Sequence, residues 1–464
     1  MAREIVCISP VDGREYVRRP TASAVEIGAA LERARAAQRV WRRVPVEERA
    51  AIVVRMIDAL KAMGEDLGEE LARQMGRPIR YGRGELRGCE ERARHMAEIA
   101  PQALAPVVPS ARPGFERRVS REPVGIVFTV APWNYPYLTT VNSVVPALIA
   151  GNAVILKHAS QTLLVGDRFQ AAFDACGLPA GLFQHLVLDH DQTLGIIAGG
   201  HVGHVAFTGS VEAGRAIERA CAGTFTTSGL ELGGKDPAYV RPDADLAYTV
   251  EQLVDGAFFN SGQCCCGIER VYVHADVHDR FLEAFVEHTK HYVLGDPLDP
   301  ATTLGPMARA AFAETVREQT AEAVARGARR AIDPALFPAN RAGTPYLMPQ
   351  VLTGVDHTMT VMREESFGPV VGVMRVSDDA EAVRLMNDSR YGLTASIWTA
   401  DVEAVRAMDA DLETGTVFMN RCDYVDPGLV WTGVKDTGRG AALSAVGYET
   451  LTRPKSHHYK LTTP

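Results

Sequence analysis

The sequence has 464 residues, of which 46% are hydrophobic, so it can bury large cores and is long enough for two or three domains. Its 49 Lys and Arg stand against 57 Asp and Glu, and the net charge of −8 comes without a basic block. This balance argues against nucleic acid and against anionic membranes as partners. No apolar signal segment opens the chain, and no run approaches the roughly 18 apolar residues of a membrane span. We therefore expect a cytoplasmic protein.

The first hundred residues show apolar side chains at helical spacing, for example Ile27, Leu31 and Ala34, and we expect them to form a helical layer. From about residue 124, short β-rich runs alternate with helices. This pattern is typical of a parallel sheet that carries helices on both faces. The expected strands of this sheet are 125–130, 153–156, 186–188 and 204–207.

A second run of the same kind follows and predicts a second α/β domain. Its expected strands are 271–273, 369–373, 394–398 and 415–419. Between the helical layer and the first sheet lies a Pro-rich segment, 105–114, which is typical either of a hairpin that reaches outward to another subunit or of a plain surface linker.

Eight cysteines are too few and too irregularly spaced for a disulfide scaffold. We expect five of them to be small buried thiols, namely Cys7, Cys89, Cys176, Cys221 and Cys422. Cys264, Cys265 and Cys266 are consecutive, and we expect that three adjacent cysteines cannot all reach one tetrahedral metal. No CxxC pair or His cluster accompanies them, so we expect no metal site, and chemistry at a thiol is the remaining interpretation.

Three segments carry candidate catalytic groups. Cys265 lies between a helix and a strand, where a thiolate can be exposed, and Glu231 precedes two glycines that let backbone approach a ligand closely. Asn134 ends a strand, and its amide can donate to a developing oxyanion. Each residue alone has an ordinary explanation: a core thiol, an ion pair and a turn former.

Taken together, six segments resemble the aldehyde dehydrogenase superfamily in order and spacing, over nearly the whole chain. They are Pro132–Asn134, Gly151–Lys157, Phe207–Ser210 with Gly214, Glu231–Gly234, Gly262–Cys265 and Glu365–Pro369. The resemblance implies two Rossmann-like open-sheet domains and a small β oligomerisation arm. The expected ranges are 1–102 and 124–232 for the NAD(P)-binding domain, 233–447 for the catalytic domain, and 103–123 with 448–464 for the arm. It also implies a homodimer or homotetramer.

The resemblance implies that Cys265 is the nucleophile, that Glu231 is the general base, and that Asn134 forms the oxyanion hole with the backbone N–H of Cys265. The flanking Cys264 and Cys266 then only shape the pocket. The residues expected at the cofactor are Trp133, Lys157, Ser160, Gly209, Ser210, Gly214, Glu365 and Phe367. The residues expected at the substrate are Tyr135, Asn142, Cys264, Cys266, Tyr424, Val425 and Trp431.

Two departures from the family pattern affect these expectations. Ser160 stands where many relatives have a glutamate that binds the adenosine ribose, so we expect NADP to be accepted as well as NAD. Ser143 stands where many relatives have a lysine thought to relay protons to the base, so the proton needs another route.

The aldehyde itself is less well defined. The aromatic character of the expected pocket favours an apolar or aromatic aldehyde. The alternative is a semialdehyde such as succinate semialdehyde, whose carboxylate Arg421 could bind, although an ordinary ion pair explains Arg421 equally well.

Three rival functions share parts of this pattern. A structural protein built on this fold would not need all three catalytic residue types. A CoA-acylating relative usually lacks the base that Glu231 supplies, and the members that reduce acyl phosphates lack the Glu-Leu-Gly-Gly segment. The sequence therefore favours hydrolysis of the thioester to a free acid.

Overall fold

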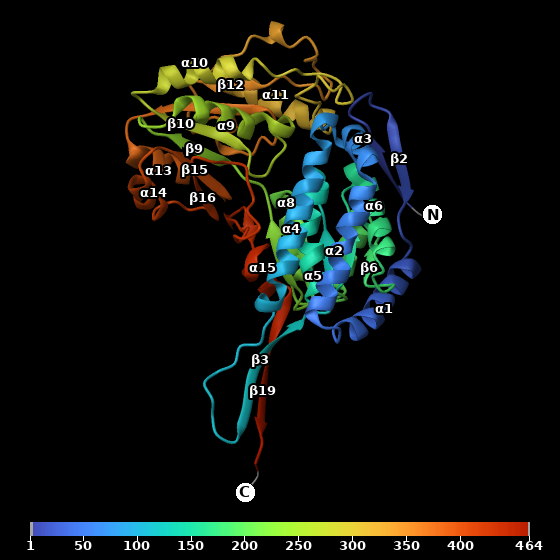
Figure 1. The fold of residues 1–464 in the computed structure, drawn as a ribbon. Coiled ribbons are helices and arrows are strands. Elements are labelled where there is room, and N and C mark those ends of the chain that lie inside the picture. The colour runs from blue at the N-terminus through green and yellow to red at the C-terminus, as the bar shows by residue number, and fades with distance from the viewer. Residues whose placement is uncertain (1–2, 463–464) are drawn as a thin grey trace.

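The computed structural model describes residues 3–462, apart from the side chain of Glu65. The chain forms two sheets, each with its own helices, and a two-stranded arm that projects away from them (Figure 1). Among the described residues, no helix combines the length and the apolar composition that crossing a lipid bilayer requires.

The first sheet has six strands: β18 (Gly438–Arg439), β8 (Thr227–Glu231), β7 (His204–Thr208), β4 (Ile126–Val130), β5 (Ala153–Lys157) and β6 (Phe183–His185), in this spatial order. All neighbours are parallel except β18 and β8. The central strand β4 is buried along its whole length, as its run of Val, Ile and Phe predicts for a sheet covered on both faces.

The helices of this part are α1 (Ala24–Trp41), α2 (Val46–Ala62), α3 (Gly64–Met75), α4 (Gly82–Ala103), α5 (Pro136–Ile149), α6 (Leu163–Ala175), α7 (His190–Ala198), α8 (Val211–Cys221) and α15 (Ser444–Thr450), with the 3-10 turns η1 (Ile79–Tyr81) and η2 (Ser160–Thr162). Helix α1 begins at a capping box formed by Ser23 and Glu26. It ends at Trp41, whose indole N–H donates to the carbonyl oxygen of Leu148 in α5 at 2.7 Å. This contact fastens the N-terminal helix to the first sheet's covering layer.

The second sheet has seven strands: β11 (Arg329–Arg330), β12 (Gln350–Thr353), β13 (Val370–Val376), β10 (Ile268–His274), β9 (Asp236–Val240), β15 (Thr394–Trp398) and β16 (Thr416–Met419), in this order. Only β11 is antiparallel to its neighbour. Its helices are α9 (Leu246–Phe258), α10 (His278–Thr289), α11 (Ala310–Ala325), α12 (Thr360–Arg363), α13 (Asp379–Asn387) and α14 (Val402–Asp409), with the 3-10 turns η3 (Phe259–Gly262) and η4 (Pro334–Leu336). A short pair, β14 (Tyr391–Gly392) with β17 (Val434–Lys435), lies beside it.

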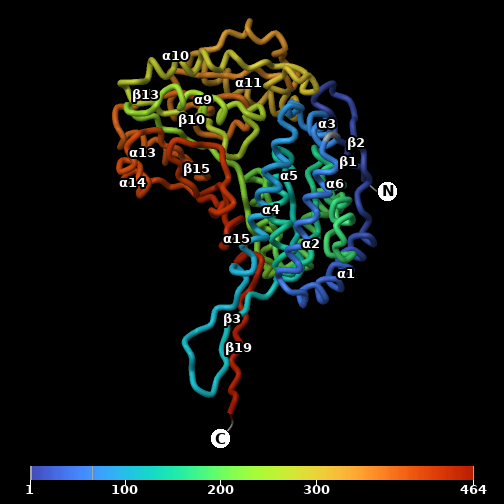
Figure 2. The backbone as a smooth tube through the Cα atoms, in the orientation of Figure 1, coloured from blue at the N-terminus to red at the C-terminus, as the bar shows by residue number. Residues whose placement is uncertain are grey.

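The arm consists of β3 (Phe115–Pro123) and β19 (Thr452–Lys460), paired antiparallel along their full lengths. It extends well beyond the rest of the molecule, with the loop before β3 bulging from it (Figures 1 and 2). The Pro-rich segment 105–114 is this loop, and Val107 pairs back onto Val119 of β3. The segment is therefore part of a projecting arm.

The predicted α/β class with two parallel sheets and an arm is confirmed, but three local expectations are wrong. The first twenty residues are not helical: β1 (Glu4–Ile8) and β2 (Glu15–Pro20) form a hairpin, because the buried Cys7 and Val17 pack on Leu163. The strand expected at 186–188 lies at β6, where the chain pairs with β5. The segment expected in the arm, 448–464, begins within a helix, because Tyr448 belongs to α15, and the strand of the arm starts at Thr452.

The Trp41 contact gives a test of the helical layer. Trp41 is 2% exposed, so Trp41→Ala removes a large core side chain and leaves the Leu148 carbonyl unpaired. We expect a loss of about 3–5 kcal/mol in unfolding free energy, measured by guanidinium denaturation. The neighbouring Val40 is 70% exposed, and Val40→Ala should change the stability by less than about 0.5 kcal/mol. Equal effects of the two substitutions would contradict the anchoring role of Trp41.

Candidate active site

Cys265 lies in the connection from η3 to β10, where the second sheet meets residues of the first. The chain turns sharply before it, because Asn260 and Ser261 adopt left-handed conformations with φ of 54° and 57°. Gly262 follows with φ of 67°, and a Cβ there would lie 2.3 Å from the carbonyl oxygen of Gly368. Only glycine fits this position, and the turn presents Cys265 at the junction of the two sheets.

The three consecutive thiols face one another. Their sulfur atoms lie within 4.8 Å of each other, so the expectation that adjacent cysteines cannot converge is wrong. The physical reason is Asp423, whose Oδ1 lies 3.0 Å from the sulfur of Cys264 and 3.1 Å from that of Cys266. Because the geometric argument against a metal fails, the absence of a metal site stays a prediction.

The flanking thiols also act on the central one. Hydrogen bonding from Cys264 and Cys266 lowers the pKa of Cys265 below the ordinary thiol value, against the opposing effect of burial. The pKa values of both neighbours are raised. The thiolate is the reactive form of cysteine, and the lowered pKa favours it at Cys265 over its two neighbours.

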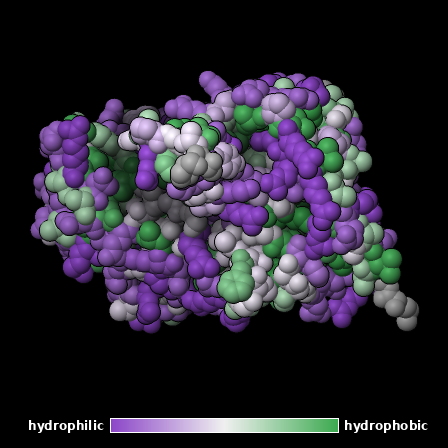
Figure 3. All heavy atoms as spheres, turned by 90° about the horizontal axis from the view of Figure 1, so that it is seen from below, coloured by the Kyte–Doolittle hydropathy of each residue, from purple (hydrophilic) through white to green (hydrophobic). Residues whose placement is uncertain are grey.

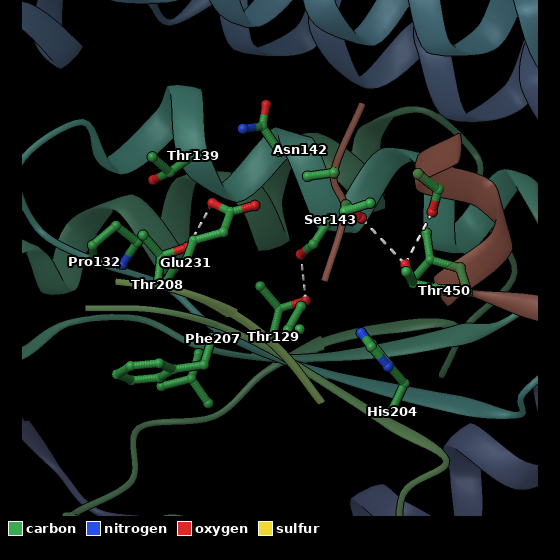
Figure 4. A pocket seen from close by; sticks show the side chains of 18 of the residues that line it. Thr129, Pro132, Thr139, Asn142, Ser143, His204, Phe207, Thr208, Glu231 and Thr450 are labelled. Carbon is green, nitrogen blue, oxygen red and sulfur yellow. Dashed lines mark hydrogen bonds between the residues drawn. The ribbon is translucent and has the colours of Figure 1, made fainter. Parts of the chain in front are cut away.

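Glu231 is the last residue of β8, and it lines a cavity between one face of the first sheet and the helices α5 and α15 (Figure 4). Thr208 Oγ1 donates to its carboxylate at 3.1 Å. Burial raises the pKa of Glu231 to about 7, and the bond from Thr208 only partly opposes this effect. A carboxyl group with a pKa near neutrality can accept a proton from water at neutral pH and release it again.

The cavity beside Glu231 offers about 40 Å³ to the centres of water molecules, more than the roughly 10–15 Å³ that one water requires. Hydroxyl groups line it: Ser143 Oγ lies 2.8 Å from Thr129 Oγ1, and Thr450 lies on the far side (Figure 4). Ser143, the residue in place of the expected lysine, therefore shares one water-sized space with Glu231.

Asn134 follows β4, and it is 5% exposed. Its Nδ2 donates to the carbonyl oxygen of Gln263, two residues before Cys265, at 3.3 Å. The amide of the first sheet and the thiol of the second are thereby brought to the same loop, as the sequence predicts for an oxyanion donor and a nucleophile.

Two charged residues that the sequence analysis missed hold Asn134 in place. The buried Arg77 donates to the backbone carbonyl of Asn134 and pairs with the buried Glu85. Glu85 in turn accepts from the backbone N–H groups of Tyr137 and Leu138, at 2.7 and 3.1 Å, and so caps α5. Nothing in the sequence marks these residues, because they resemble the exposed charges of an ordinary helix.

The expected phosphate-binding residues surround the start of α8. Ser210 caps this helix by accepting from the N–H of Ala213 at 3.3 Å, which leaves other first-turn amides free for an anion. Gly209 precedes the cap, and a Cβ on Gly214 would lie 2.6 Å from a Leu232 methyl carbon, so glycine lets the helix pack closely on the chain after β8.

Lys157 and Ser160 lie beyond the carboxyl end of β5. Burial lowers the pKa of Lys157 to about 8, and within residues 3–462 no carboxylate lies within 4.0 Å of its amine. A second cation, which the sequence analysis missed, approaches Ser160: Arg309 Nη2 donates to Ser160 Oγ at 3.2 Å. Two cations at the end of one strand suit an anionic ligand such as a nucleotide.

Three further expected cofactor residues lie together. Trp133 stacks on Phe312 with ring centroids 5.4 Å apart and meets the edge of Phe367 at 5.6 Å. Glu365 accepts from the N–H of Gly234 at 3.0 Å, and burial raises its pKa to about 8. Aromatic faces beside hydrogen-bonding groups can hold a flat heteroaromatic ring and its sugar.

Four expected substrate residues lie near the helices α4 and α5. Tyr135 packs against the guanidinium of Arg77, 4.6 Å from its ring centroid. Asn142 Oδ1 accepts from Arg92 at 3.1 Å, and Asn142 also lines the cavity of Glu231. Cys264 and Cys266 flank the nucleophile, as described.

The other three come from the loop before β17. Tyr424 donates to Glu91 of α4 at 3.2 Å, and Arg421 stacks on the Tyr424 ring with its guanidinium carbon 3.4 Å from the centroid. Val425 is half-buried, and Trp431 is buried, with its backbone paired to Ala442. Arg421 is exposed, and its guanidinium packs on the Tyr424 ring.

Comparison with known proteins agrees with this geometry. The model of the aldehyde dehydrogenase family matches residues 1–457. The succinate semialdehyde dehydrogenase [NAD(P)+] Sad of Escherichia coli is 34% identical over 446 residues, 96% of each chain, and the vanillin dehydrogenase of Corynebacterium glutamicum is 33% identical over 93% of this chain and 89% of its own. The structure of succinic semialdehyde dehydrogenase from Streptococcus pyogenes with NADP+ superposes with a TM-score of 0.93 at 28% identity, over 98% of this chain and 100% of the other. The chain belongs to the aldehyde dehydrogenase family.

Proposed function

We propose that this aldehyde dehydrogenase oxidises its substrate to a carboxylic acid through a thioester on Cys265. The observation that carries the proposal is that a thiol with a lowered pKa and an amide donor lie at the same loop. The pKa of Cys265 is lowered, and Asn134 Nδ2 donates to the carbonyl oxygen of Gln263 in the loop that holds Cys265. Glu231, with a pKa of about 7, lines the water-sized cavity nearby.

The Cys265 thiolate adds to the aldehyde carbon, and the new alkoxide receives hydrogen bonds from Asn134 Nδ2 and the backbone N–H of Cys265. Each such donor lowers the barrier by about 3 kcal/mol in comparable sites. A bound nicotinamide would accept the hydride from that carbon. The carbon then holds a thioester to Cys265.

Glu231 completes the reaction by taking a proton from water, so that hydroxide adds to the thioester carbon and the acid departs with the thiolate restored. The proton must then leave a half-buried carboxyl group. We propose that it leaves through water in the cavity, past Thr129 and Ser143, since no lysine stands at position 143.

The choice of cofactor depends on the charges near Ser160. Lys157 and Arg309 approach the position where Ser160 replaces a carboxylate, and a 2′-phosphate carries about −1.5 to −2 charges. NADP is therefore accepted, as is NAD. The relatives bear names with NAD(P)+ and NADP+.

The names of the relatives indicate two classes of aldehyde substrate. Among the relatives are proteins named for succinate semialdehyde and for vanillin, an anionic and an aromatic aldehyde. Both classes that the sequence left open therefore stay candidates.

We propose that the arm forms the contact between subunits of a homodimer or homotetramer. Apolar side chains on it are exposed to solvent, including Val108 at 69% and Leu461 at 63%. Figure 3, which views the molecule from below, shows hydrophobic residues between larger hydrophilic areas. An exposed two-stranded ribbon with free edges gains stability by pairing with another chain. The cytoplasmic location stays a prediction.

Replacing the base tests the thioester route. Glu231→Gln keeps the side chain's shape but cannot accept a proton, so we expect a burst of reduced cofactor near one per active site and then slow turnover. Intact-protein mass spectrometry should find an acyl group on Cys265. Cys265→Ala should carry no such adduct, whereas Cys264→Ala should still form one. A cofactor burst without any adduct would sink the proposal.

The hydrogen bond from Thr208 gives a pH test. Deacylation needs ionised Glu231, so its rate should rise with pH through about 7. Thr208→Val removes a bond that favours the ionised form, which raises the pKa and moves the rise to higher pH. Thr450→Val is the matched control, because Thr450 lines the same cavity but its hydroxyl donates to the carbonyl oxygen of Gly447. If the pH at which the deacylation rate rises moved equally in both variants, Glu231 would not be the group that titrates.

Cofactor choice can be tested at Ser160. The parent should use NADP at least as well as NAD, and Ser160→Glu should lower kcat/KM for NADP by about 5- to 150-fold, the range of a charged hydrogen bond. Ser160→Ala, which removes the hydroxyl without adding charge, should have a smaller effect. A parent that strongly prefers NAD, or NADP use that Ser160→Glu leaves unchanged, would refute the charge argument.

A further inference from the structure

Arg92 is a buried cation that forms no salt bridge within the described residues. It lies in the middle of α4 and is 7% exposed. Its Nη1 donates to Asn142 Oδ1 at 3.1 Å and to the Leu138 carbonyl oxygen at 3.2 Å, both in α5. In the described part of the chain, no carboxylate lies within 4.0 Å of its guanidinium, and Nε and Nη2 donate to no protein acceptor.

Two other buried arginines of this protein are satisfied differently, whereas Arg49 also lacks a carboxylate partner and donates through Nε and Nη1 to carbonyl oxygens. Arg77 pairs with Glu85, and Arg270 uses all three nitrogens on carbonyl and hydroxyl oxygens. The two spare nitrogens of Arg92 are also absent from the buried polar atoms without a partner, so they border open space. Burying a charge in this state is unfavourable, and an anionic ligand would offset the cost.

The guanidinium lies within electrostatic range of the proposed catalytic residues. Besides burial, which lowers the pKa of Arg92, the groups that act on it electrostatically are Glu231, Cys266, Cys89 and Cys265, the first of these most strongly. Its acceptor Asn142 lines the cavity that Glu231 also lines. Arg92 thus lies on α4 against α5, and its hydrogen-bond partner Asn142 borders the cavity that Glu231 lines.

The cation suggested by the sequence does not fill this role. Arg421 is exposed and stacked on Tyr424, so it has no buried position facing Cys265.

We propose that Arg92 binds the anionic end of the substrate, which is therefore an aldehyde with an oxyanion such as a carboxylate at its other end. The proposal rests on the thioester reaction at Cys265 and adds the class of its substrate. Asn142 acts as a positioning residue, because its Oδ1 occupies Nη1 and leaves Nε and Nη2 to the ligand.

The test compares aldehydes of equal size with and without charge. Succinate semialdehyde is paired with butanal, and 4-carboxybenzaldehyde with benzaldehyde, so that aliphatic and aromatic anions are distinguished. The parent should prefer the charged member of at least one pair. Arg92→Met should lower kcat/KM for that member by about 10- to 100-fold, the range of a charge-assisted hydrogen bond, and change the neutral member by less than about threefold. Arg92→Lys should recover part of the loss.

Arg49→Met is the matched control. Arg49 is also buried, and its Nε donates to a carbonyl of α5, that of Ile149, at 2.7 Å. This variant should leave the ratio of charged to neutral aldehyde unchanged even if it lowers stability. The proposal would be overturned if the parent preferred the neutral aldehyde of both pairs. It would also be overturned if Arg92→Met lowered kcat/KM equally for the charged and the neutral aldehyde. The two proposals can fail separately. If only the role of Arg92 is wrong, Glu231→Gln should still form an acyl adduct on Cys265 with butanal. If Glu231→Gln forms no adduct, the thioester route itself is wrong.

Discussion

The chain passes from the first sheet to the second through Gly233 and Gly234, and the active site depends on how little room this passage leaves. A Cβ on Gly233 would lie 2.2 Å from a carboxylate oxygen of Glu365, and one on Gly234 would lie 2.3 Å from the carbonyl oxygen of Cys265. The Glu365 carboxylate is the end of a side chain and could move, whereas the Cys265 carbonyl is backbone, so a side chain at Gly234 would force the loops apart. Glu231 precedes this passage by two residues, and Cys265 contributes the backbone oxygen that the passage approaches.

A buried ion pair fixes the far side of this passage. Lys235 follows Gly234 directly and pairs with Glu269 on β10, and both side chains are almost wholly buried. Glu269 also accepts from the backbone N–H groups of Ser366 and Phe367, at 2.8 and 2.9 Å. The pair is therefore satisfied by further hydrogen bonds, the condition under which buried charges are tolerated. It ties β9, β10 and the loop of Glu365 together at one point.

The two reacting groups are tuned in opposite directions by different causes. Burial dominates at Glu231 and raises its pKa to about 7, which suits a group that must bind and release a proton. At Cys265 hydrogen bonds from the neighbouring thiols outweigh burial and lower the pKa, which suits a nucleophile. Asp423 gathers those two thiols, so an acidic residue distant in sequence shapes the nucleophile without touching it.

The sequence by itself determined the α/β class, the two parallel sheets and the family, because alternating strands and helices and contiguous motifs are local in the chain. It also predicted that Cys265, Glu231 and Asn134 belong together, though only through their resemblance to a family. Only the tertiary structure decided how charges are partnered. Arg77, Glu85, Arg92 and Arg309 look like ordinary helix or loop charges in the sequence, and their burial arises from contacts between segments far apart in the chain. The convergence of three consecutive thiols required Asp423, more than 150 residues away, and the hairpin of the first twenty residues required Leu163. Periodicity reports which face of one element is apolar, whereas the partner of a buried charge depends on the packing of several elements at once.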